Sequence, residues 1–456
     1  MFEYLSFLRP PPEACPLGQP VTFVPQIAND LRTEPCETEH NIYFTWQSDS
    51  GALHRGGFTK LTTWKPGSTS YKPLSVAFPN EARPGDTWRL CLAVSLDSNK
   101  ISPRSLALDL TQPEFGRLPF PVISLPISVL AGETRDTRAT RPASGKQPFK
   151  AKSKPTAEHN VAKQEKIERL YSLPSNRGTL RITEQTSFDL DKKIWDSGVG
   201  VSSWLAKLLA KPESPGQSHE LIGLFRDRLQ SARDGARALQ IVELGAGTGL
   251  VSLVLGALLA EYNRSTSNVD RGQEVEPRSV LRARILVTDL SSAIELIDYN
   301  RLSNSHLFDS GINAVEGSEE TTRTCRIELH AMELDWDNPI STSVWDKDRM
   351  SGVHYPFDII VMADVTYNTA SFGALLDTLT GLLQGPSGSG SSPLVLLAYK
   401  CRDPAERTLW VNALARGIAF VRVDAVKGVR EPEVEIWLGG WERDVNSFWS
   451  AARADE

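Results

Sequence analysis

The sequence has no hydrophobic run near the roughly 20 residues needed to span a bilayer. Its longest apolar stretch, residues 250–260, is interrupted by Ser252 and Gly256. Cysteine is scarce, with five in the chain and no CxxC pair. A disulfide framework or a structural zinc site is therefore not expected, and a reducing compartment fits best. The seven histidines are scattered without the spacing of metal ligands, so we predict no metal site.

Charge of one sign is not in large excess either. The formal net charge is -6 over 456 residues, which is too small to indicate a dedicated nucleic-acid or membrane binder. Hydrophobic residues make up 40% and charged residues 23%, as in ordinary globular proteins, and this excludes global disorder. The length suits two or three domains. We expect a monomer in the cytoplasm, with the nucleus as a second location.

Residues 1–134 are expected to form a β-rich N-terminal module. Short runs of β-forming residues alternate with turn formers such as Lys65-Pro66-Gly67, and helical periodicity is absent. The predicted strands are 21–24, 42–46, 88–94 and 121–130.

Residues 135–166 have the composition of a linker. They hold nine Lys or Arg against three Asp or Glu, a net charge of +6, and almost no aromatic residue. A basic arm for RNA, for an acidic partner or for nuclear import is one interpretation. A solvated, flexible tether is the interpretation we favour, because charge runs commonly stay solvated.

Residues 167–456 alternate between strand and helix patterns. Short buried strands followed by helices predict a mostly parallel, Rossmann-like α/β sheet with helices on both faces. Two final strands without room for a helix between them predict a terminal antiparallel hairpin, which gives seven strands. Polar segments 263–282 and 385–392 are expected to be loops. The predicted strands are 241–244, 285–288, 326–329, 357–362, 394–399, 420–426 and 434–438, and the predicted helices are 250–260, 291–302, 372–383 and 404–416.

The strongest local motif is ELGAGTG at residues 243–249, between a strand and a helix. Glycines allow the backbone to approach a ligand closely, and the helix N-terminus favours an anion. The order G-x-G-x-G differs from the dinucleotide fingerprint G-x-G-x-x-G, which argues against an NAD-dependent oxidoreductase. Glu243 would repel a pyrophosphate but can hold an ammonium. S-adenosylmethionine carries an ammonium and a carboxylate together; a turn without any ligand is the alternative.

Two further residues are candidates for binding a nucleoside. Asp289 ends the second strand, where a carboxylate can accept both ribose hydroxyls, although it can also cap the next helix. Trp336, in LDWDNP, can stack on an adenine or belong to the core. Trp195 precedes an amphipathic segment, and core packing is the plain interpretation of this residue.

Asp364 and Tyr367 follow the fourth strand in VMADVTYN. They lie at the carboxyl edge, where open α/β sheets place their ligands. Their spacing allows both side chains to face one cleft. The alternative is that Asp364 caps a turn. We favour a functional pair.

Four motifs occur together in the order typical of one family: Trp195-Asp196-Ser197, the glycine loop, Leu334 to Trp336, and Ala363 to Tyr367. Over residues 182–441 the chain resembles the lysine-methylating group (methyltransferase family 16) of the class I, seven-stranded S-adenosylmethionine-dependent methyltransferases. The resemblance implies that Asp364 and Tyr367 lie beside the target amine. It also implies cofactor contacts from Trp195, Glu243, Gly245, Ala246, Gly247, Gly249, Asp289, Trp336 and Ala363.

The resemblance implies a protein lysine as the substrate, with translation factors and chaperones among the family's targets. We expect Asp364 to bind and orient the lysine, the nearby sulfonium to lower the pKa of its amine, and Tyr367 to accept a hydrogen bond. A methyltransferase for RNA or a small molecule, and a non-catalytic binding protein with this fold, are the alternatives. We expect no membrane partner and no nucleic acid. A tether that separates the N-terminal module from the catalytic core suggests that this module recruits the substrate.

Overall fold

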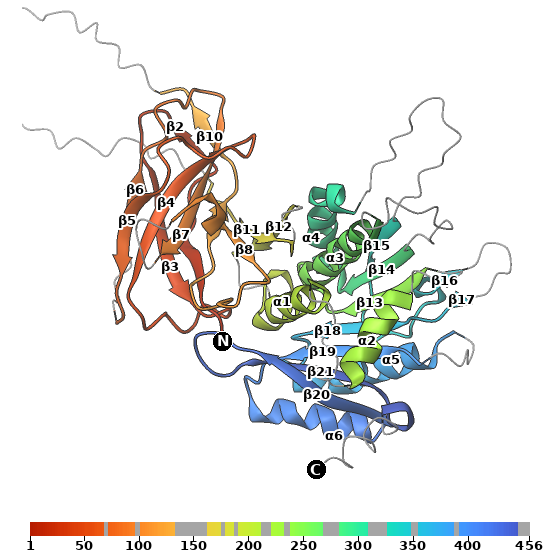
Figure 1. Cartoon of the computed structure of the whole chain (residues 1–456). Helices are drawn as coiled ribbons and strands as arrows, with labels where there is room; N and C mark the ends of the chain where they lie inside the picture. Colours follow the sequence, from red (N-terminus) through yellow and green to blue (C-terminus); the bar gives the residue numbers. More distant parts are fainter. Residues whose placement is uncertain are drawn as a thin grey trace, which may run out of the picture.

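The computed structural model describes residues 1–67, 72–95, 101–132, 162–174, 178–186, 190–210, 220–231, 238–267, 282–308, 326–347, 354–386 and 392–445. A β-rich part and an α/β part lie side by side (Figure 1). Within these residues no helix combines the length and the apolar character required to cross a membrane. The predicted linker, residues 135–166, lies outside the described residues except for 162–166.

The α/β part is built on a seven-stranded sheet in the order β15-β14-β13-β18-β19-β21-β20. Its first five strands are parallel, and β21 runs antiparallel to both β19 and β20. The predicted parallel sheet with a terminal hairpin is therefore confirmed. The strands are β13 (Leu239–Leu244), β14 (Arg282–Asp289), β15 (Arg326–Glu333), β18 (Ile359–Ala363), β19 (Leu394–Tyr399), β20 (Ile418–Val426) and β21 (Val434–Trp441).

Helices cover both faces of this sheet (Figure 1), as the alternating pattern predicts. Because side chains alternate along a strand, Ile241 packs in one hydrophobic cluster and Val242 in the other. The first cluster contains side chains of α1 (Asp196–Ala210), α2 (Glu220–Ser231), α3 (Leu250–Ser267) and α4 (Ser291–Ser303). The second contains side chains of α5 (Phe372–Gln384) and α6 (Thr408–Leu414).

Two helix boundaries differ from the expectation. The predicted loop 263–282 is wrong at its ends, because α3 continues to Ser267 and β14 begins at Arg282. Polar residues alone do not end a helix when no glycine or proline interrupts it. Residues 268–281 of that loop, and 387–391 of the loop predicted at 385–392, lie outside the described residues. A short 3₁₀ turn, Pro404–Arg407, precedes α6 in the predicted helix 404–416.

The N-terminal part contains a three-stranded sheet, β1-β3-β6, and a nine-stranded sheet. The predicted strand 121–130 is two strands, because Pro126, which cannot donate to a ladder, lies between them. A separate pair, β16 (Asp346–Lys347) and β17 (His354–Tyr355), lies in the α/β part. The N-terminal strands are β1 (Tyr4–Arg9), β2 (Ala14–Pro16), β3 (Val21–Ala28), β4 (His40–Ser48), β5 (Thr59–Trp64), β6 (Leu74–Val76), β7 (Thr87–Ser95), β8 (Ala107–Asp109), β9 (Val122–Ser124), β10 (Ile127–Leu130), β11 (Lys166–Ser172) and β12 (Thr179–Gln185).

After the predicted linker, the chain adds two strands to the N-terminal part before it forms the α/β part. Strand β11 follows the predicted linker, yet it pairs with β8 and β9 of the nine-stranded sheet, and β12 pairs with β11. The predicted division of the chain at residue 167 stays a prediction, but segments on both sides of the linker share one sheet.

The two parts also share a hydrophobic core. Phe2 and Phe120 of the N-terminal part belong to the same buried cluster as Val199 of α1 and Val434 of β21. Phe2 also stacks at 5.2 Å from Phe120. The expectation that a tether keeps the N-terminal module apart from the core is therefore wrong, since close-packed side chains join the two.

Candidate active site

A cavity of about 260 Å³ lies at the carboxyl edge of β13, β14 and β18. Parallel sheets place their ligands at this edge, because the loops that follow successive strands meet there. All the predicted site residues line it except Gly249. Those that line it are Trp195, Glu243, Gly245, Ala246, Gly247, Asp289, Trp336, Ala363, Asp364 and Tyr367.

The glycine loop makes a tight turn between β13 and α3. Gly245 has φ +63°, in the left-handed region that other residues rarely adopt. A Cβ at Gly245 would lie 2.8 Å from Cγ1 of Val365 and 3.4 Å from the Trp336 ring, so only glycine fits there. Gly249 does not line the cavity; its φ of +77° lets the backbone enter α3. Gly249 therefore shapes the loop and is not placed to touch a ligand.

Glu243 is a buried acid at the end of β13. It is 2% exposed, and its Oε2 accepts the Ser252 N–H at 3.0 Å and the Ser252 hydroxyl. Burial raises the pKa of this carboxyl to about 7, against the hydrogen bonds from Ser252 that lower it. Among the described residues no ion pair includes Glu243. A cavity-lining acid without a cationic partner fits the ammonium of a bound ligand.

Asp289 orients the glycine loop from the end of β14. Its Oδ2 accepts the N–H of Gly247 at 2.7 Å, and its Oδ1 accepts the N–H of Leu290 at 2.7 Å. Burial raises the pKa of Asp289. Helix α4 begins after Leu290 without a side-chain cap, so the alternative that Asp289 caps this helix does not hold. Each carboxylate oxygen keeps a second lone pair that can accept a ligand hydroxyl.

The two predicted tryptophans are both partly buried and both reach the cavity. Trp336 lies next to Gly245, because a Cβ built on Gly245 would lie 3.4 Å from the Trp336 ring. The Trp195 indole N–H donates to the carbonyl of Leu190 at 2.9 Å. The chain at Asp191 and Lys193 covers the glycine loop, since their carbonyls lie 3.5 and 3.6 Å from a Cβ built at Gly247.

Asp364 sits on a strained turn directly after β18. Its φ is +63°, which is uncommon for a residue other than glycine. Both carboxylate oxygens are engaged by one guanidinium: Nη2 of Arg402 lies 2.7 Å from Oδ2, and Nη1 donates to Oδ1. Tyr367, which is 57% exposed, stands at the rim of the cavity. Partial burial, followed by the charges of Asp289 and Asp191, raises the pKa of Tyr367.

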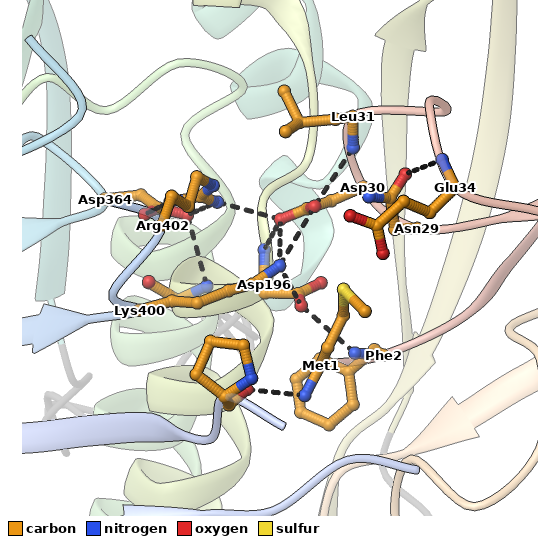
Figure 2. A network of polar contacts seen from close by, with 12 residues as sticks. Met1, Phe2, Asn29, Asp30, Leu31, Glu34, Asp196, Asp364, Lys400 and Arg402 are labelled. Carbon is orange, nitrogen blue, oxygen red and sulfur yellow. Dashed lines mark hydrogen bonds and ion pairs between the residues drawn. The ribbon is translucent and has the colours of Figure 1, made fainter. Parts of the chain in front are cut away.

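Sequence reasoning missed Arg402 and Lys400. Both follow β19, and they form a buried network with three acids (Figure 2). Lys400 Nζ lies 3.1 Å from Asp30 and 2.8 Å from Asp196, and Arg402 Nη2 lies 2.8 Å from Asp30. Burial, and then the charge of Asp30, raises the pKa of Asp196 to about 6. The sequence did contain an indication of this network, because Lys400 and Arg402 come just after a strand that ends at the ligand-binding edge.

A second polar cluster lies in the N-terminal part. Ligand-type atoms of Glu3, Cys36 and His40 lie within 4.8 Å of one another. Cys36 Sγ lies 3.0 Å from Glu3 Oε2, and His40 Nε2 lies 2.7 Å from the hydroxyl of Thr38, which is outside the cluster. Arg430 Nη2 also lies 3.3 Å from Glu3, which places a cation beside the acid that a metal would need.

Comparisons with known proteins place this geometry in context. A family model described as "Lysine methyltransferase" matches residues 174–414. A sequence comparison with curated proteins gave no match. A proposed RNA methyltransferase from Pyrococcus horikoshii is similar in structure, with 13% identity, a TM-score of 0.26, and coverage of 53% of this chain and 96% of its own. Magnesium protoporphyrin IX methyltransferase from Synechocystis, with bound S-adenosylhomocysteine, has 10% identity, a TM-score of 0.25, and coverage of 52% and 91%.

Proposed function

Because the chain belongs to the lysine methyltransferase family, we propose that it transfers a methyl group to a lysine side chain of a protein. Methyltransferase activity and the cofactor S-adenosylmethionine follow from membership of the family. What we add is the substrate class and the roles of the residues around the cavity.

The lining of the cavity supports binding of the cofactor in one orientation. Glu243 offers the ammonium of the methionine end a buried carboxylate that has no cationic partner among the described residues. The backbone N–H groups where α3 begins suit its carboxylate. Asp289 offers acceptors to the ribose hydroxyls, and Trp336 offers an aromatic face to the adenine. When bound, the cofactor supplies an already activated methyl group, so the protein needs to align the acceptor and exclude water.

Acidic residues around the cavity favour a cationic substrate. Asp191, Asp335 and Asp337 line it, and Lys193 is the basic residue among the lining side chains. Such a surface attracts a protonated lysine and disfavours the phosphates of RNA. This is the observation on which the choice of a lysine over a nucleic acid depends.

The pairing of Asp364 with Arg402 bears on the proton that the lysine must lose. Transfer of that proton to water costs about 4.6 kcal/mol at pH 7 for an amine with a pKa near 10.4. A free carboxylate beside the amine would raise this cost, because it stabilises the ammonium. The Arg402 guanidinium compensates the charge of Asp364, so Asp364 can orient the amine by a hydrogen bond without holding it in the charged form. Tyr367 at the rim can accept a second hydrogen bond from the amine.

The experiment that tests this function is labelling with a radioactive methyl donor. Purified protein and tritiated S-adenosylmethionine are added to a lysate of cells that lack this protein, and the protein, RNA and small-molecule fractions are then separated. We expect label in the protein fraction, and we expect it to fall to background with Asp364→Asn. Label confined to RNA or to small molecules would contradict the proposal in favour of the alternatives, and absence of label from every fraction would favour a non-catalytic binding protein.

A further inference from the structure

Asp30 connects the N-terminal part to the catalytic edge of the α/β sheet. It follows β3, and its side chain is 0% exposed. In Figure 2 it points away from its own strand toward Lys400 and Arg402, which follow β19. The described contacts of its carboxylate thus go mainly to the other part of the molecule.

One guanidinium is shared between Asp30 and the predicted catalytic acid. Arg402 Nη2 lies 2.8 Å from Oδ2 of Asp30 and 2.7 Å from Oδ2 of Asp364. The guanidinium also lies over the Trp195 ring, 5.3 Å from its centroid. Two acids and an aromatic face hold the planar group, so its orientation is set from three sides. The orientation of Arg402 in turn fixes both oxygens of Asp364.

A second anchor keeps Asp30 in place. Lys400 Nζ lies 3.1 and 3.2 Å from its two oxygens and 2.8 Å from Asp196. Asp196 accepts hydrogen bonds from the Phe2 N–H at 3.0 Å and from the Tyr4 hydroxyl at 2.8 Å. Both donors belong to the N-terminal part. The network therefore crosses the interface at two places, through Asp30 and through the N-terminal segment that holds Phe2 and Tyr4.

Attachment of the two parts alone does not require these charges. Burial of ions is costly, and apolar side chains of similar volume often serve as well or better. The aromatic cluster around Phe2 and Phe120 already joins the parts in that way. The charged network does more than this aromatic cluster, because it connects Asp30 to the cavity. Asp30 contacts Arg402, and Arg402 contacts Asp364, which lines the cavity.

We propose that Asp30 is a positioning residue for methyl transfer, acting through Arg402 on Asp364, so that the N-terminal part completes the active site. This inference rests on the proposed function, in which Asp364 orients the acceptor amine. Asp30 itself is not among the residues that line the cavity. When Asp30 loses its charge, Arg402 is released on one side and Asp364 is no longer held in a single orientation.

The test compares Asp30→Asn with Glu168→Gln in the full-length protein. Glu168 is a matched control, because it is 1% exposed, lies in the nine-stranded sheet and pairs with Arg89 and Arg181 away from the cavity. Each variant is assayed with tritiated S-adenosylmethionine over a series of lysate concentrations. Binding of S-adenosylhomocysteine is measured by calorimetry, since its stoichiometry reports the folded fraction.

For Asp30→Asn we expect kcat to fall about tenfold or more, while the affinity and the stoichiometry of S-adenosylhomocysteine stay within about twofold of the wild type. Glu168→Gln should lower the melting temperature but leave kcat per folded molecule unchanged. If Asp30→Asn does not fold, Arg402→Lys replaces it, because a lysine ammonium cannot bridge Asp30 and both oxygens of Asp364, and the same loss of kcat is expected.

Wild-type kcat in Asp30→Asn, or a loss of rate that matches a loss of binding stoichiometry, would overturn the inference. The same experiment distinguishes failure of this inference from failure of the proposed function. If the wild type labels RNA instead of protein and Asp30→Asn lowers that labelling, the lysine substrate is wrong and the role of Asp30 stands. If protein is labelled equally by both, the role of Asp30 is wrong and the function stands.

Discussion

The two oxygens of Asp364 face the two terminal nitrogens of Arg402 in a bidentate ion pair, with Nη2 2.7 Å from Oδ2. Such pairs fix geometry as well as charge, because two parallel hydrogen bonds define one plane. Asp364 therefore enters the cavity as an oriented and charge-compensated carboxylate. It is not a free base, and this distinction determines the effect expected of each substitution around it.

Asp364→Asn should remove turnover but spare the cofactor. Asparagine tolerates the left-handed backbone at this position, where φ is +63°, so the turn should survive. It cannot form the bidentate pair with Arg402, and we expect kcat to fall about a hundredfold as the acceptor loses its alignment. Calorimetry with S-adenosylhomocysteine should give an affinity close to that of the wild type. Turnover at the wild-type rate would remove Asp364 from the mechanism.

Binding of S-adenosylhomocysteine should strengthen as the pH rises from 6 to 7.5. Glu243 has a pKa of about 7, so it is largely protonated at pH 6 and largely ionised at pH 7.5. The ligand ammonium needs the ionised form, and we expect affinity to increase about eightfold over this range. Calorimetry at several pH values measures the effect. Glu243→Gln should bind weakly and without this dependence; an unchanged pH profile in Glu243→Gln would assign the dependence to another group.

Ionisation of Glu243 should lower the stability of the cofactor-free protein, although it strengthens binding of the ligand. The folded pKa of Glu243 lies above the value of 4.5 that it has when exposed, so the folded protein loses stability as the pH rises from about 4.5 to 7. The loss is on the order of 3 kcal/mol. Glu243→Gln should therefore raise the melting temperature at pH 8 and leave it almost unchanged at pH 4.5. A lower melting temperature at pH 8 would indicate that the carboxylate has a structural partner.

Gly245→Ala should cost both stability and cofactor affinity. Its Cβ would lie 2.8 Å from Val365 and would add to the strain of a positive φ. Gly57→Ala is the matched control, because Gly57 has φ +65° and nothing within 4 Å of an added Cβ. We expect Gly57→Ala to lower the melting temperature only. Equal cofactor affinity in the two variants would contradict the placement of Gly245 against the cavity.

Removal of residues 1–161 should abolish folding instead of freeing a catalytic domain. Strand β11 would lose β8 and β9, and Lys400 would lose Asp30 as a buried partner. Phe2 and Phe120 would also leave the shared core. Circular dichroism during heating tests this, and we expect no cooperative transition unless residues 1–134 are co-expressed. A cooperative transition of the shortened chain alone would contradict the shared core.

The sequence was sufficient to predict the α/β sheet and the residues around its cavity. Short apolar runs followed by helical patterns mark β13 to β19, and a sheet of this kind brings the ends of its strands together. Gly245, Asp289 and Asp364 could be placed at one edge, because Asp289 ends a strand and the other two directly follow one. Local patterns of this sort need no knowledge of distant contacts.

The contacts between distant segments could not be predicted in this way. Asp30 and Arg402 are 372 positions apart, and neither belongs to a motif that anticipates the other. Strand β11 joins the N-terminal sheet through hydrogen bonds whose register only the three-dimensional structure gives. The end of α3 is rich in polar residues, a pattern that predicts a loop, but polar residues without a glycine or proline among them do not end a helix.

The most direct test of the central claim identifies the amino acid that receives the methyl group. Protein labelled with tritiated S-adenosylmethionine in the lysate is hydrolysed in acid, and the radioactive amino acids are separated against standards. We predict that the label elutes as Nε-methylated lysine with the wild type and is absent with Asp364→Asn. Label in methylated arginine or histidine, or a lysine signal of equal size with Asp364→Asn, would contradict a lysine site built around Asp364.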